Sequence, residues 1–131
     1  MNIGLIAHDS KKELMENFCI AYKNILKNHV LYATGTTGER IRDQVGLNVN
    51  CLLPGHLGGD SQMCAQIECN QIDAMFFLRD PYSLMNRDTD FSKLIQLCDV
   101  NNIPIATNLA MAELLIIAID RGDLEWRNLY K

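Results

Sequence analysis

Short apolar runs alternate with amphipathic stretches along the whole chain, and this alternation constrains the fold more than any other feature. The apolar runs are of strand length, and the amphipathic stretches repeat at helical spacing. No repeat, low-complexity tract or linker interrupts the pattern. Strands that alternate with helices through short connections pair in parallel, because right-handed crossovers leave few other topologies. We therefore expect an α/β fold, a three-layer sandwich with a mainly parallel five-stranded sheet of the flavodoxin-like or Rossmann-like kind.

The local sequence gives the expected boundaries of these elements. The stretch at 72–78 is a nearly continuous apolar run, which is typical of a central strand covered on both faces. Ser10 and Glu13 have the spacing of a capping box, which predicts that the first helix begins there. The expected strands are residues 2–7, 30–33, 49–53, 72–78 and 103–107, and the expected helices are residues 10–28, 38–45, 60–70, 91–100 and 109–119.

Length and charge restrict the class of protein. With 131 residues the chain falls below the roughly 150 residues of a typical domain, so we expect one domain spanning residues 1–131. Sixteen acidic and twelve basic residues give a net charge of −4, and no long Lys/Arg run is present, which argues against nucleic-acid and membrane partners. No apolar stretch reaches the ~18 residues of a membrane span, and no leader precedes the first strand, so we expect a cytoplasmic protein.

Cysteine and histidine spacing argues against a disulfide framework and against a metal site. The five cysteines are an odd number without a C-x-x-C pair, so buried thiols are the better interpretation. The histidines at positions 8, 29 and 56 are scattered and lack the H-x-x-x-H spacing that places two imidazoles on one helical face. We expect no metal.

Glycine and polar residues follow the predicted strands, where ligands bind in parallel α/β sheets. The segment TGTTG, beginning at Thr34, combines two glycines with three hydroxyls and leads into a helix whose free N–H groups attract anions. Such a turn suits a phosphate, although glycine and threonine are also common at strand-to-helix turns for backbone reasons. Lys12, on the same rim, either adds a positive charge to this turn or is a solvated surface lysine.

Two carboxylates and a histidine belong to the same rim. Asp60 follows two glycines at a predicted helix start, where a carboxylate can cap free N–H groups, and Asp9 has the same ambiguity. Opposite a phosphate turn, however, two carboxylates and His8 are the groups needed to abstract a proton next to a carbonyl and expel a phosphate. The sequence contains neither a nucleophilic Ser-His-Asp elbow nor a Walker lysine.

The segments NIGLIAHD, LYATGTTG, GGD and IPIATN, in this order and at these spacings, resemble the methylglyoxal synthase family over essentially the whole chain. The resemblance implies elimination of phosphate from dihydroxyacetone phosphate to give methylglyoxal through an enediolate. It implies a homohexamer that needs no metal or organic cofactor, with a small phosphorylated metabolite and inorganic phosphate as ligands. The alternative is a binding or regulatory module of the same fold with weakened or lost catalysis, since related domains sense metabolites.

The resemblance also implies roles for individual residues. The aspartate of GGD, here Asp60, is the general base, and Asp9 is the second carboxylate of the site. Asp80 and Asp90 keep two further acidic positions of the family. The contacts to phosphate and substrate fall on His8, Lys12, Thr34, Gly35, Thr36, Thr37 and Gly55.

Two segments depart from the family pattern. Pro54, Gly55 and His56 stand where the family has Ser-Gly-Pro, so Pro54 replaces a serine whose hydroxyl contacts phosphate. Asn86 and Arg87 stand where the family has Pro-His, whose imidazole handles protons on the substrate oxygens. Arg87 cannot shuttle a proton, but its guanidinium can meet the negative charge of an enediolate. We therefore expect Arg87 to be a catalytic residue of a slower enzyme.

Overall fold

A five-stranded, entirely parallel sheet forms the centre of the molecule, as the sequence predicts. The computed structural model describes residues 1–82 and 88–130. Its strand order, β3-β2-β1-β4-β5, is that of a Rossmann-like fold. The strands are β1 (Asn2–Ala7), β2 (Val30–Ala33), β3 (Asn50–Cys51), β4 (Ala74–Leu78) and β5 (Ile105–Ala106).

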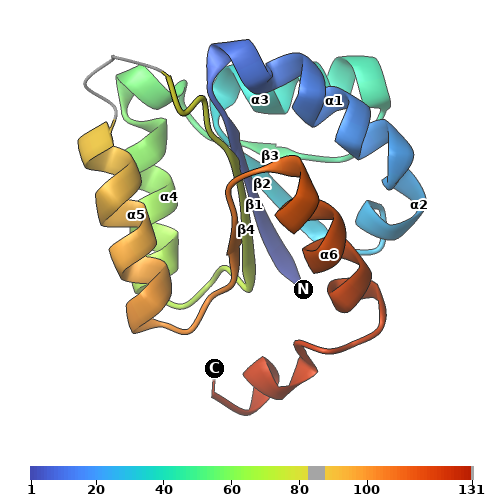
Figure 1. Ribbon diagram of the computed structural model, residues 1–131, viewed down its shortest axis with the longest axis vertical. Coiled ribbons are helices and arrows are strands. Elements are labelled where there is room, and N and C mark those ends of the chain that lie inside the picture. Colours follow the sequence, from blue (N-terminus) through green and yellow to red (C-terminus); the bar gives the residue numbers. More distant parts are fainter. Residues whose placement is uncertain (83–87, 131) are drawn as a thin grey trace.

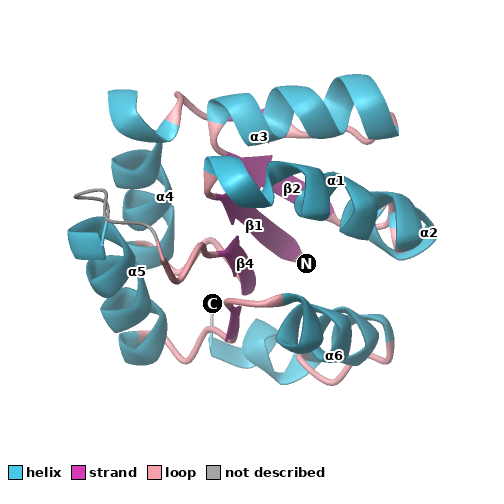
Figure 2. Ribbon diagram, turned by 45° about the horizontal axis from the view of Figure 1, so that its top comes forward, coloured by secondary structure: helices cyan, strands magenta, loops and turns pink. Residues whose placement is uncertain are grey.

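Helices cover both faces of the sheet and complete three layers (Figure 1). One face carries α4 and α5, and the other carries α1 and α6, with α3 beside α1 in both views (Figure 2). Short 3₁₀ turns lie at Asp9–Lys11, Gly55–Leu57 and Glu125–Tyr130, and a π-helical turn at Ile41–Val45 continues α3. The helices are α1 (Lys12–Ala21), α2 (Lys23–Leu26), α3 (Gly35–Arg40), α4 (Gly59–Glu68), α5 (Asp88–Val100) and α6 (Leu109–Asp120).

The alternation of side chains along the central strands divides the core in two. On β4, Phe76 packs into the core shared with α1 and α6, whereas its neighbours Met75 and Phe77 pack into the core shared with α4 and α5. All five residues of β4 are buried, which confirms the expectation of a central strand covered on both faces. The apolar run at 72–78 is therefore fully used for packing and leaves the chemistry to the loops after the strands.

The expected first helix, residues 10–28, is wrong at its start and in its continuity. The hydroxyl of Ser10 donates to Asp80 Oδ2 at 2.8 Å, so it does not cap a helix, and α1 begins at Lys12 without a side-chain cap. Tyr22 leaves the helical region, with φ −113° and ψ 23°, and separates α1 from α2. Hydrogen bonds from Tyr22 N to Phe18 O and from Leu26 N to Tyr22 O keep the two helices close to one axis.

Other elements also differ from the sequence-based expectation. The helix expected at 38–45 begins earlier, at Gly35, because the residues of the TGTTG turn themselves form its first turn. The outer strands β3 and β5 contain two residues each, fewer than expected, because each pairs with a single neighbour. The 3₁₀ turn Glu125–Tyr130 has no counterpart among the predicted elements.

This last turn is held by a buried arginine. The guanidinium of Arg127 donates to the carbonyls of Asn101 and Asn102 at 3.0 and 2.7 Å and pairs with buried Asp73 at 3.4 Å. Leu124 packs against the core, whereas Trp126 and Leu129 remain 45% and 81% exposed. The C-terminal segment is thus anchored through a polar network and leaves part of its apolar surface uncovered.

The described helices are all too short or too polar to cross a membrane. All five cysteines are free thiols. Three of them, Cys19, Cys64 and Cys98, are buried, whereas Cys51 and Cys69 are exposed. Burial raises the pKa of both Cys19 and Cys98 to about 12, so these two thiols stay protonated and act as apolar packing groups.

Candidate functional site

Because every pair of neighbouring strands is parallel, the carboxyl ends of all five strands lie at one edge of the sheet. The strand order reverses between β1 and β4, and the helices that follow these two strands, α1 and α5, cover opposite faces (Figure 2). A crevice opens at such a reversal, and it is where open α/β sheets bind ligands. The predicted site residues after β1, β2 and β3 lie along this same edge.

The ammonium group of Lys12 joins the end of β1 to the TGTTG turn after β2. Lys12 is buried, and its Nζ donates to Ala7 O at 2.8 Å and to Thr37 Oγ1 at 3.2 Å. Asp9 Oδ1 lies 3.4 Å from the same nitrogen, although the Asp9 side chain is 90% exposed. The structure therefore brings three predicted site residues together, and Lys12 is not the solvated surface lysine of the alternative interpretation.

The TGTTG turn itself packs tightly against the loop after β3. Thr34 is buried at the N-cap position of α3, Thr37 is buried within its first turn, and Thr36 is exposed. The backbone N–H of Gly35 donates to Leu53 O at 3.1 Å. A Cβ at Gly35 would lie 2.8 Å from the backbone nitrogen of Pro54, so glycine is required for this close approach.

Asp60 reaches the site from the other side of the same loop. It is buried in the first turn of α4, and its neighbour Gly59 packs so closely that a Cβ there would lie 1.8 Å from Leu53 O. The backbone of Leu53 and Pro54 therefore lies against the starts of both α3 and α4. The N-cap position of α4 is occupied by Gly58 at φ +111°, so Asp60 lies within the first turn of the helix and not at its N-cap.

His8 is fixed by the backbone that follows β4. The backbone N–H of Asp80 donates to His8 Nδ1 at 2.9 Å, which requires that Nδ1 carries no proton and places the proton of the neutral ring on Nε2. The ring is buried and meets Phe77 edge-on, with centroids 5.2 Å apart. His8 is thus oriented by contacts that connect β1 to β4.

Asp80 links the two strand ends through its side chain as well. Its carboxylate accepts hydrogen bonds from the Ser10 hydroxyl at 2.8 Å and from the Tyr82 N–H at 2.9 Å. These two bonds, Ser10 first, together with the nearby charge of Lys11, hold the pKa of Asp80 below its usual value. Sequence reasoning missed this role of Ser10, because the capping-box spacing offered a local explanation for the same residue.

The remaining predicted residues that the structure describes come from the loop after β3 and from the start of α5. Pro54 and Gly55 are half-buried in the loop between β3 and α4. Asp90 belongs to the first turn of α5. Arg87, the predicted replacement for the family histidine, and Asn86 lie outside the described residues.

Comparison with known proteins places the chain in a family. A family model described as the MGS-like domain matches residues 15–107. The methylglyoxal synthase of Caldicellulosiruptor saccharolyticus is 60% identical over 129 residues, which cover 98% of this chain and 92% of that protein. The methylglyoxal synthase of Clostridioides difficile is 54% identical over 131 residues, which cover 100% of this chain and 96% of that protein.

The fold agrees with these sequence matches. A crystal structure of methylglyoxal synthase from Elizabethkingia anophelis superimposes with a TM-score of 0.83 at 37% sequence identity. The superposition covers 88% of this chain and 76% of that one. Sequence and fold agree over nearly the full length, and the chain therefore belongs to the methylglyoxal synthase family and is a lyase.

Proposed function

We propose that this protein eliminates phosphate from dihydroxyacetone phosphate and releases methylglyoxal, with Asp60 as the general base. The observation that carries the proposal is the contact between the buried Lys12 ammonium and the Thr37 hydroxyl at the carboxyl edge of the sheet. A buried cation beside a glycine-threonine turn at a helix start is a site for a dianionic phosphate group. The names of the relatives supply the product, methylglyoxal, and the resemblance of the sequence to their family implies the substrate.

Binding of the phosphate group falls to the residues around Lys12. The backbone N–H groups at the start of α3 and the threonine hydroxyls are donors, and Lys12 supplies the charge. Gly35 and the loop after β3 complete the cradle, because the packing of Pro54 against Gly35 leaves space only for backbone. The set proposed to hold the phosphate and the rest of the substrate is His8, Lys12, Thr34, Gly35, Thr36, Thr37, Pro54 and Gly55.

The chemistry begins with removal of a proton from the hydroxymethyl carbon of the substrate, next to the carbonyl. The carboxylate of Asp60 accepts this proton, and the electron pair of the broken C–H bond forms an enediolate. The enediolate then expels phosphate from the other carbon, which leaves an enol that takes up a proton to become methylglyoxal. Burial of Asp60 in the first turn of α4 suits this role, because its carboxylate has a fixed position away from bulk water.

Negative charge on the substrate oxygens must be met while the enediolate exists. With Nδ1 engaged by Asp80 N–H, His8 carries its proton on Nε2 and can act as a hydrogen-bond donor. Arg87 is proposed to add a cation that stabilises the charge without giving up a proton. Asp9, ion-paired with Lys12 at the exposed rim, is proposed as the second carboxylate that aids proton transfer.

The proposal also covers the oligomeric state and the cellular compartment of the protein. Three apolar side chains of α6 are exposed, namely Met111, Leu114 and Ile117, and Trp126 and Leu129 add to them near the C-terminus. Exposed apolar surface of this kind supports a homo-oligomer of single-domain subunits, which the family resemblance makes a hexamer. Five free thiols support a reducing, cytoplasmic setting.

Incubation of the purified protein with dihydroxyacetone phosphate tests the function. We expect methylglyoxal and inorganic phosphate to appear in equal amounts, without added metal or cofactor. Phosphate binding measured by calorimetry together with no methylglyoxal would refute the enzyme and favour a binding module. Light scattering in the same buffer tests the assembly, and a monomer near 14.8 kDa would refute the oligomer.

A further inference from the structure

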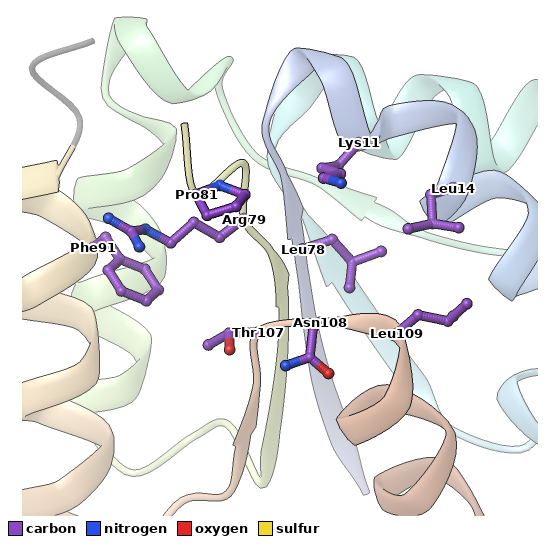
Figure 3. A pocket seen from close by; sticks show the side chains of 9 residues that line it. All are labelled: Lys11, Leu14, Leu78, Arg79, Pro81, Phe91, Thr107, Asn108 and Leu109. Atoms are coloured by element: carbon purple, nitrogen blue, oxygen red, sulfur yellow. The ribbon is translucent and has the colours of Figure 1, made fainter. Parts of the chain in front are cut away.

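A second cavity lies in the crevice between the ends of β1 and β4, and the proposed reaction does not use it. This crevice pocket has a volume of about 310 Å³ and is lined by residues that follow β1, β4 and β5 (Figure 3). That volume is at the lower end of the range for small-molecule sites. None of the residues assigned to phosphate binding lines it.

The walls of the crevice pocket combine positive charge with apolar surface. Lys11 and Arg79 line it from opposite sides, and its described lining contains no carboxylate. The guanidinium carbon of Arg79 lies 4.4 Å from the ring centroid of Phe91, so this cation presents a flat stacked surface. Leu14, Leu78 and Leu109 supply the apolar part of the wall.

Polar groups at the end of β5 add specific hydrogen-bonding capacity. Thr107 and Asn108 line the pocket where the twelve-residue helix α6 begins. The Asn108 side chain caps α6 by accepting from Met111 N–H at 3.0 Å, which leaves the amide NH₂ of Asn108 as a donor. The positive end of the α6 dipole is directed toward the same space.

The two neighbouring lysines serve different places. Lys12 Nζ is held by Ala7 O and Thr37 Oγ1 at the TGTTG turn, whereas the Lys11 side chain lines the crevice pocket. The ammonium group of Lys11 makes no hydrogen bond within the described part of the chain, so it can donate to a ligand. The two adjacent lysines therefore serve different places: Lys12 contacts the TGTTG turn, and Lys11 lines the crevice pocket.

We propose that the crevice pocket binds a small organic anion, a carboxylate or phosphate group on a planar or apolar body, independently of the phosphate turn. The anionic group meets Lys11 and the start of α6, and the body lies against the leucines and the stacked Arg79. Charge alone would not fill the apolar part, and an apolar body alone would not use the positive charge of Lys11. The occupant is therefore larger than inorganic phosphate.

The linkage between His8, Asp80 and Ser10 adjoins the crevice pocket. Asp80 N–H fixes His8, and the Asp80 carboxylate holds Ser10, which precedes Lys11 in the chain. Arg79 and Pro81, on either side of Asp80, both line the pocket. An anion in the crevice pocket would therefore lie beside the segment that orients His8.

Calorimetry with benzoate, in saturating inorganic phosphate that fills the phosphate turn, tests the proposal on the full chain. We expect millimolar binding of benzoate, with much weaker binding of acetate, which lacks the body, and of benzyl alcohol, which lacks the charge. Lys11→Met should weaken benzoate about tenfold, the loss expected for one charge-assisted hydrogen bond. Lys93→Met, which removes an exposed charge outside the pocket, should leave the affinity unchanged.

A second variant tests the location without changing charge. Leu109→Trp should fill the crevice pocket and abolish benzoate binding, while phosphate binding and the unfolding transition confirm the fold. Displacement of benzoate by phosphate would show that benzoate binds at the TGTTG turn and would overturn the proposal. Equal effects of Lys11→Met and Lys93→Met, equal affinity for benzyl alcohol, or no binding to the folded protein would also overturn it.

Discussion

Replacement of Gly59 by alanine should separate the carboxylate of Asp60, the proposed base, from the turn proposed to bind phosphate. A Cβ at this position would lie 1.8 Å from Leu53 O, whereas real Cβ contacts essentially never fall below 3.0 Å. The loop after β3 and the start of α4 must therefore move apart by about 1.2 Å. The atoms that the Cβ would meet belong to the backbone of Leu53 and Pro54, so no flexible side chain can absorb the shift.

The displacement is large on the scale that catalysis tolerates. A misplacement of about 1 Å at a reacting group can lower a rate by about 10²-fold, and Asp60 directly follows the substituted residue. We expect kcat/KM for dihydroxyacetone phosphate to fall by about 10²-fold in Gly59→Ala. The free energy of unfolding should fall by about 1 to 3 kcal/mol, the usual cost of overpacking.

Gly122→Ala is the matched control for the loss of stability. Gly122 has φ +80° and follows α6, far along the chain from the site. An alanine there would lower the free energy of unfolding by about 1 to 2 kcal/mol, because L side chains are strained in the left-handed region. The assay pairs denaturant unfolding with methylglyoxal production for both variants. We expect similar destabilisation but a large loss of activity in Gly59→Ala alone. Parental activity in a folded Gly59→Ala protein would refute the packing argument.

Further substitutions test separate parts of the account. Lys12→Met should weaken phosphate binding by about tenfold or more in calorimetry, and Lys11→Met should not; equal losses would show that the two lysines are not divided as described. Burial and the positive N-terminus, whose nitrogen lies 3.1 Å from His29 Nδ1, lower the pKa of His29 in the folded state. The unfolded chain therefore binds a proton at His29 at a higher pH than the folded protein does, so the free energy of unfolding should fall as pH drops below about 6.5. The urea midpoint of His29→Gln should fall less between about pH 7.5 and pH 5.5 than the midpoint of the parent protein. Arg87→His should raise turnover and add a titration near neutrality to the pH profile, and a decrease in activity would instead make Arg87 an adapted catalytic residue.

The alternation of strands and helices was enough to predict the parallel sheet, because few topologies satisfy short right-handed connections. Periodicity could not show that β3 and β5 contain only two residues each, since strand length at an edge depends on the neighbour. It also could not show the turn Glu125–Tyr130. That turn depends on Arg127 reaching Asp73 and two carbonyls from distant parts of the sequence.

The TGTTG turn was predictable because its glycines and threonines are adjacent in sequence, although its helix begins at Gly35 and not at residue 38. Its partner Lys12 was ambiguous until the fold showed the ammonium group buried against Thr37. Ser10 and Asp60 both matched local capping patterns. A tertiary contact overrode the first, because Ser10 bonds to Asp80, and Asp60 lies within the first turn of α4, whose N-cap position is Gly58. The crevice pocket has no sequence signal, because its lining comes from four separate segments.

The assignment of Asp60 as the general base is tested most directly by comparing Asp60→Asn with Asp9→Asn. Both changes keep the shape of the side chain and remove its charge, but Asp60 is buried in α4 and Asp9 is exposed at the rim. With phosphate binding confirmed for each, single-turnover conversion of dihydroxyacetone phosphate to methylglyoxal should slow by at least ~10²-fold in Asp60→Asn. The loss in Asp9→Asn should be smaller. Near-parental turnover in a folded, phosphate-binding Asp60→Asn protein would contradict the account and assign the proton abstraction to another residue.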